Sequence, residues 1–114
     1  MIGVSDQKHK FGYRIFNDLL EAGYNVTGVN PRGIEVCGRK LFKSLKEVTP
    51  KPDFVITVVP ASVTEKVVDD CIALGIKEIW MQPGSESREA VKKAEAAGLK
   101  VTAGACFMVV VGEW

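Results

Sequence analysis

The run Phe54–Val59 constrains the fold more than any other segment of the chain. It has the sequence FVITVV, and five of its six residues are β-branched. Apolar side chains alternate onto both faces of such a strand, so neither face is suited to water. A strand buried on both faces is typical of the centre of a parallel sheet covered by helices. The segment therefore predicts an α/β domain.

Shorter apolar runs alternate with amphipathic segments over the rest of the chain, which predicts right-handed βαβ units. We expect helices over residues 11–22 and 87–97, a third helix capped by Ser62 or Thr64 and closed by Gly75, and strands over residues 1–4, 24–29, 54–59, 78–81 and 99–103. Together they predict one α/β domain over residues 1–114, with a five-stranded parallel sheet and helices on both faces. Four residues are few for a central first strand, so we expect the native start to be trimmed or to lie upstream.

Two smaller segments complete the prediction. A helical turn is expected at Ser44–Val48, and the apolar tail Phe107–Val111 is either a final strand or a contact in a homo-oligomer.

Composition excludes several classes of protein. Fifteen basic and fourteen acidic residues give a net charge of +1, which argues against a nucleic-acid partner. No apolar run approaches the roughly 18 residues of a membrane helix, and the absence of a signal-peptide stretch predicts a cytoplasmic protein. Three cysteines without a CxxC motif, and a single histidine, argue against a zinc site. We expect reduced, buried thiols.

The segment Gly3–Gly12 is the first candidate for a binding loop, because it joins a strand to a helix at the ligand-binding edge of such a sheet. Free backbone N–H groups at a helix N-terminus bind anions, and glycine lets a phosphate approach the backbone. The loop lacks the GxGxxG pattern, and the chain contains no GxxxxGK[ST] motif. The alternative is a plain connection between strand and helix.

The end of the second expected strand narrows the ligand class. A site for NAD needs Asp or Glu there to accept hydrogen bonds from the ribose, whereas this strand ends Val29-Asn30-Pro31-Arg32. A positive group at this corner suits a nucleotide with an extra ribose phosphate, such as NADP or coenzyme A. Residues 1–46 hold eight basic and four acidic residues, a local excess of +4. No serine has an evident histidine partner, and no catalytic residue is nominated.

Six short motifs, in this order, carry a resemblance to a known family: GVS with KFG at residues 3–12, VNPR at 29–32, VVP at 58–60, WMQPG at 80–84 and GACFMV at 104–109. The chain resembles the small stand-alone CoA-binding proteins, whose fold is similar to the CoA-binding domain of the succinyl-CoA synthetase alpha chain. The resemblance covers nearly the whole chain and implies a Rossmann-like domain that holds coenzyme A across its strand ends.

The resemblance also implies which residues contact coenzyme A. They are Gly3, Val4, Ser5, Lys10 and Gly12 in the phosphate loop, Asn30, Pro31 and Arg32 at the adenosine corner, Val59 and Pro60 at the third strand end, and Gln82, Pro83 and Gly84 beside the pantetheine path. The chain departs from the family near Cys106, where Ala105 and Val110 replace the basic and acidic residues that relatives often show.

We therefore expect a non-catalytic protein that binds coenzyme A or an acyl-CoA, with no membrane or nucleic-acid partner. Two alternatives remain at this point. One is a fragment of an NADP-binding oxidoreductase, and the other is a structural or interaction domain that has lost its ligand.

Overall fold

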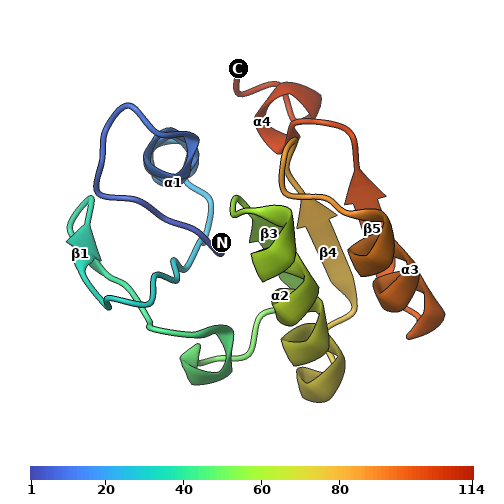
Figure 1. Ribbon diagram of the computed structural model, residues 1–114. Coiled ribbons are helices and arrows are strands. Elements are labelled where there is room, and N and C mark those ends of the chain that lie inside the picture. The colour runs from blue at the N-terminus through green and yellow to red at the C-terminus, as the bar shows by residue number, and fades with distance from the viewer.

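A computed structural model describes the whole chain, Met1–Trp114, and three parallel strands form its centre (Figure 1). They are β3 (Phe54–Thr57), β4 (Glu78–Met81) and β5 (Lys100–Ala103), in the spatial order β3-β4-β5. Both strand pairs are parallel, so their carboxyl ends lie at one edge of the sheet. This is the edge at which open α/β sheets bind ligands.

The prediction of five regular strands was wrong, because residues 1–4 and 24–29 make only isolated bridges. Ile2 bridges Val29 on one side and Thr57 on the other, in parallel orientation. Gly3, with φ of 101°, turns the chain away immediately after Ile2, which leaves no length for a strand. Val29 follows Gly28 and also bridges Phe42. Glycine weakens a strand interior, so this segment also contributes a bridge rather than a strand.

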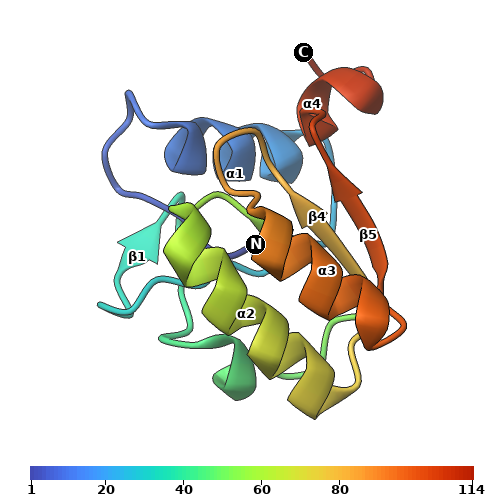
Figure 2. The same ribbon diagram turned by 45° about the vertical axis from the view of Figure 1, so that its right-hand side comes forward.

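Helices cover both faces of the sheet, as predicted. The helix α1 (Phe11–Glu21) and the short α4 (Phe107–Val110) lie on one face, whereas α2 (Ala61–Leu74) and α3 (Arg88–Ala96) lie side by side on the other (Figure 2). Along β3, Val55 packs into the core under α2 and α3, and Ile56 packs into the core under α1. This alternation confirms that the strand is buried on both faces.

The predicted helix boundaries are mostly close to the observed ones. Ser87 caps α3, and its hydroxyl oxygen accepts a hydrogen bond from the Ala90 amide at 3.0 Å. Gly75, with φ of 72°, ends α2. The cap of α2 is different from the prediction: the helix begins at Ala61 with Pro60 as its N-cap. Proline has no side-chain acceptor, so this end of the helix has no side-chain cap.

The remaining segments are short. The strands β1 (Glu35–Val36) and β2 (Arg39–Lys40) form an antiparallel hairpin, and the 3-10 turn η1 (Leu45–Glu47) confirms the predicted turn. The tail Phe107–Val111 begins with α4 rather than with a strand, since its backbone bonds are helical. Its other expected role, a contact in a homo-oligomer, stays a prediction. The longest helix has 14 residues, and none is long and apolar enough to cross a membrane. No group of three side chains is arranged to hold a metal ion.

Candidate functional site

A cleft of about 620 Å³ opens at the carboxyl edge of the sheet. Three segments form its walls: the loop between Gly3 and Gly12, the turn at Asn30–Arg32 and the end of β3 at Val58–Pro60. The chain leaves Ile2 toward α1 on one face of the sheet and leaves the neighbouring β3 toward α2 on the other face. The cleft therefore lies at a point where the crossovers change sides, the usual ligand site of such folds.

Two glycines allow the loop to lie at backbone distance from the start of α1 and from the end of β3. A Cβ atom on Gly12 would overlap the carbonyl oxygen of Gly3 and lie 3.3 Å from the amide nitrogen of Ser5. A Cβ atom on Gly3 would overlap the carbonyl oxygen of Val58, and its φ of 101° already disfavours any side chain. Both positions need glycine because the loop, the start of α1 and the end of β3 approach one another at backbone distance.

Backbone donors without partners line this cleft. The amide groups of Ser5, Phe11 and Gly12 make no hydrogen bond within the protein, and all three residues line the cleft. On the opposite wall, α2 begins directly after Pro60, so a second helix N-terminus lies beside the same space. Helix N-termini carry partial positive charge. The cleft therefore offers several donors and a favourable field to an anion.

Asn30 ties two walls of the cleft together. Its Nδ2 donates to the carbonyl oxygen of Val4 at 2.8 Å, and its Oδ1 accepts from the amide of Arg32 at 2.8 Å. The Arg32 guanidinium in turn lies 3.1 Å from a carboxylate oxygen of Asp6. Lys10 forms no ion pair, so its ammonium group is available to a ligand.

Ten of the thirteen predicted contact residues line the cleft, namely Gly3, Val4, Ser5, Lys10, Gly12, Asn30, Pro31, Arg32, Val59 and Pro60. Sequence reasoning missed Gln7, Phe11 and Val58, whose only signal was their place within or beside the predicted segments. His9, the single histidine of the chain, also lines the cleft.

Gln82, Pro83 and Gly84 lie outside the lining of this cleft. The Gln82 side chain is buried, with Oε1 accepting from the Phe107 amide at 2.7 Å and Nε2 donating to Cys106 Sγ at 3.3 Å. The loop still adjoins the cleft, because the Ser85 hydroxyl oxygen accepts a hydrogen bond from the Val59 amide at 2.9 Å. A direct ligand contact by these three residues stays a prediction.

The half-buried Cys106 has an altered acidity. Burial alone would raise the pKa of this thiol, but hydrogen bonds from Gln82 and from the backbone of Val109 and Met108 outweigh it and lower the pKa. Hydrogen bonds to the charged form of a group favour that form. By contrast, Cys71 lies in the core, where burial raises its pKa to about 12.

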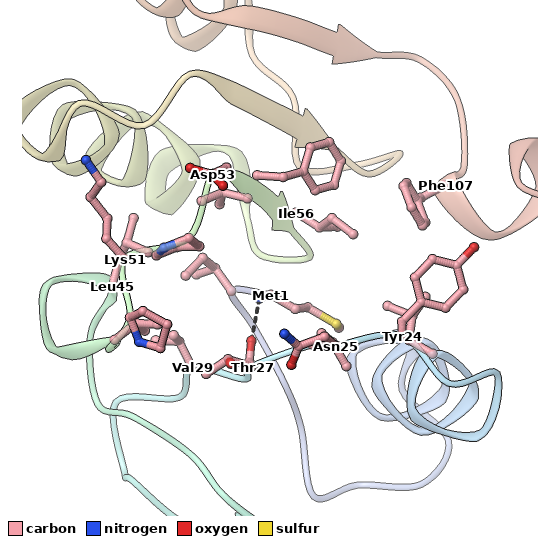
Figure 3. Close-up of a pocket in the computed structure, with 18 residues that line it drawn as sticks. Met1, Tyr24, Asn25, Thr27, Val29, Leu45, Lys51, Asp53, Ile56 and Phe107 are labelled. Carbon is pink, nitrogen blue, oxygen red and sulfur yellow. Dashed lines mark hydrogen bonds between the residues drawn. The ribbon is translucent and has the colours of Figure 1, made fainter.

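A second cavity, of about 460 Å³, lies at the amino ends of the strands (Figure 3). Twelve of its eighteen lining residues are hydrophobic, with Tyr24 and Phe107 close together at one end and Lys51 at the other. The Met1 amine donates to the Thr27 carbonyl oxygen at 2.7 Å inside it. No glycine loop contributes to this cavity, so the unpaired loop amides described above belong to the cleft at the carboxyl edge.

Comparison with known proteins identifies a family over almost the whole chain. The sequence model of a family described as a CoA binding domain matches residues 1–112. An ADP-forming acetate–CoA ligase I from Archaeoglobus fulgidus is 31% identical over 94% of this chain and 17% of the ligase. The alpha subunit of an ADP-forming acetate–CoA ligase II from Pyrococcus furiosus is 32% identical over 93% of this chain and 26% of that subunit. The chain thus spans about a quarter or less of these ligases.

Stand-alone proteins of similar size also match. A conserved hypothetical protein from Pyrococcus furiosus has a solved structure with a TM-score of 0.91 and 37% sequence identity, covering 96% of this chain and 94% of that chain. An uncharacterized protein from Bacillus subtilis is 26% identical over 96% of this chain and 81% of its own length.

Proposed function

This chain belongs to the CoA-binding domain family, and we propose that it binds coenzyme A or an acyl-CoA in the cleft at the carboxyl ends of its strands. One observation carries the proposal. The backbone amides of Ser5, Phe11 and Gly12 donate no hydrogen bond within the protein. These residues line the cleft together with Lys10, which forms no ion pair. Such donors at a helix N-terminus suit the pyrophosphate of the cofactor.

The cleft also suggests how the ligand is arranged. The pyrophosphate would lie against the loop and the start of α1, and the adenosine end would lie at Asn30–Arg32, where Arg32 supplies a positive charge for the ribose phosphate. The pantetheine arm would then leave past Pro60 toward the loop at Gln82–Gly84. The hydrogen bond from the Val59 amide to Ser85 supports this direction, because it joins the two loops that the arm would cross.

We propose that this binding is not accompanied by catalysis in the chain itself. The only histidine, His9, makes no side-chain hydrogen bond to a carboxylate or to a nucleophile. The hydroxyl oxygen of Ser5 accepts a hydrogen bond from the Gln7 amide rather than contacting a base. The cleft therefore lacks the paired nucleophile and base that acyl transfer needs.

Calorimetric titration with CoA, acetyl-CoA and NADPH tests the proposal. We expect saturable binding of CoA and acetyl-CoA. Lys10→Ala should weaken it by about tenfold to a hundredfold, because a hydrogen bond to a charged group contributes about 1.5–3 kcal/mol. Lys8→Ala is the matched control, since Lys8 carries the same charge in the same loop but does not line the cleft.

Two results would overturn the proposal. One is the absence of CoA and acetyl-CoA binding at millimolar ligand. The other is tighter binding of NADPH than of CoA, which would favour a dinucleotide site. Equal loss of affinity in Lys8→Ala and Lys10→Ala would show that only the overall charge matters and would remove Lys10 from the site.

A further inference from the structure

We propose that Asp6 forms an ion pair with Arg32 that competes with a ligand phosphate and so lowers the affinity of the cleft for its anionic ligand. The inference rests on the proposed function and adds to it a residue that tunes affinity. Asp6 is not one of the residues expected to contact the ligand, and its role follows from its ion pair with Arg32.

The pair joins two walls of the cleft. Asp6 lies between Ser5 and Gln7, which both line the cleft, and Arg32 lines the wall formed by the turn after Val29. The distance between Arg32 Nη2 and Asp6 Oδ1 is 3.1 Å. A carboxylate and a phosphate present equivalent oxygen acceptors to a guanidinium group. The Asp6 carboxylate therefore takes one of the five N–H donors of the guanidinium and sets a negative charge beside any phosphate bound at this corner.

Asp6 is distinctive among the acidic residues of the chain. No aspartate or glutamate lines the cleft, and no other ion pair of the protein involves a residue of the lining. The carboxylate of Asp6 is thus the one negative charge paired with a residue of the lining. It compensates the positive group on which the adenosine end of the ligand would depend.

The geometry of the turn lets Arg32 exchange partners. Its backbone is held by the hydrogen bond from the Arg32 amide to Asn30 Oδ1, and Asn30 is held by Val4. Its side chain, however, is 61% exposed and that of Asp6 is 45% exposed. An exposed ion pair is weak and is screened by salt. A phosphate can therefore displace Asp6, at the cost of a modest decrease in affinity.

The expected magnitude follows from the exposure of the pair. Replacing Asp6 removes the competitor, and for an exposed pair at low salt this should tighten CoA binding by about two- to fivefold. Because 3′-dephospho-CoA lacks the ribose phosphate, its affinity should change little. The increase in CoA affinity should also disappear when Arg32 is replaced, since Asp6 then has no guanidinium group to pair with.

The test is a double-mutant cycle measured by calorimetry at low ionic strength. It uses Asp6→Asn, Arg32→Gln and the double variant, each titrated with CoA and with 3′-dephospho-CoA. Asp69→Asn is the matched control, because it also removes an exposed carboxylate, paired with Lys93 at 2.9 Å, but outside the cleft. Unchanged melting temperatures establish that each variant is folded.

Tighter CoA binding in Asp6→Asn, absent in the Arg32→Gln background, supports the inference. An equal, Arg32-dependent increase in the affinity for CoA and for 3′-dephospho-CoA also supports the inference, and it would assign the Arg32 contact to the pyrophosphate instead of the ribose phosphate. Three results would overturn the inference and leave the proposed function intact, provided that the wild-type chain binds CoA. They are tighter CoA binding in Asp6→Asn that persists in the Arg32→Gln background, weaker CoA binding in Asp6→Asn, and unchanged CoA binding in Asp6→Asn. If the wild-type chain binds neither ligand, the proposed function fails with it.

Discussion

Gly12→Ala should separate the phosphate loop from the start of α1. The added Cβ would overlap the carbonyl oxygen of Gly3 and lie 3.3 Å from the Ser5 amide nitrogen, so the loop must move away from the helix. Overpacking of this kind costs about 1–3 kcal/mol of stability. The displaced segment carries the free amides of Ser5 and Gly12. Loss of one hydrogen bond to a charged phosphate, about 1.5–3 kcal/mol, should weaken CoA binding by about tenfold to a hundredfold.

The assay pairs urea denaturation with calorimetric titration of CoA. Gly23→Ala is the control, because Gly23 lies just beyond the other end of α1, with φ of 87° and no atom within 4 Å of its Cβ position. Its strained backbone should cost about 1–2 kcal/mol of stability, with CoA affinity unchanged. If Gly12→Ala is folded and binds CoA as tightly as the wild-type chain, the donors assigned to this loop do not hold the ligand.

Two further predictions concern buried polar groups. Gln82→Leu should lower the free energy of unfolding by about 1–3 kcal/mol and raise the pKa of Cys106, because it removes a hydrogen bond that favours the thiolate. In a Cys37→Ser background the pH midpoint of thiol modification should therefore move upward, while the buried Cys71 stays unreactive; an unchanged midpoint would contradict the role given to Gln82. Thr57→Val should raise the free energy of unfolding by about 1 kcal/mol, since the Thr57 hydroxyl is buried without a hydrogen-bond partner, and lower stability in urea would show that the hydroxyl is satisfied.

The parts of the fold that sequence could predict are those set by local patterns. The apolar alternation of Phe54–Val59 established a strand buried on both faces, and the amphipathic pattern of residues 11–22 established α1 to within one residue at its end. Gly75 marked the end of α2 because a left-handed residue there favours glycine. Each of these signals depends on neighbouring residues alone.

The first two expected strands, at residues 1–4 and 24–29, do not form as regular strands, for a reason that local sequence patterns do not show. Ile2 does bridge Val29 on one side and Thr57 on the other, so the expected central place of the first strand is confirmed. Whether a bridge extends into a strand depends on the residues beside it, and Gly3 must turn to let the loop approach Val58. The need for a close backbone approach at the cleft therefore outweighs strand formation.

Gln82 shows how far a motif can specify a site. The motif placed this residue correctly at the end of β4, yet its side chain is buried and holds Phe107 and Cys106 rather than lining the cleft. A motif fixes the position of a residue along a strand, but the partners available in the folded chain decide what its side chain contacts. The amide of Gln82 satisfies the first N–H of α4, which otherwise has no acceptor. Gln82 therefore positions α4 and lowers the pKa of Cys106, and a direct contact of Gln82 with a ligand stays a prediction.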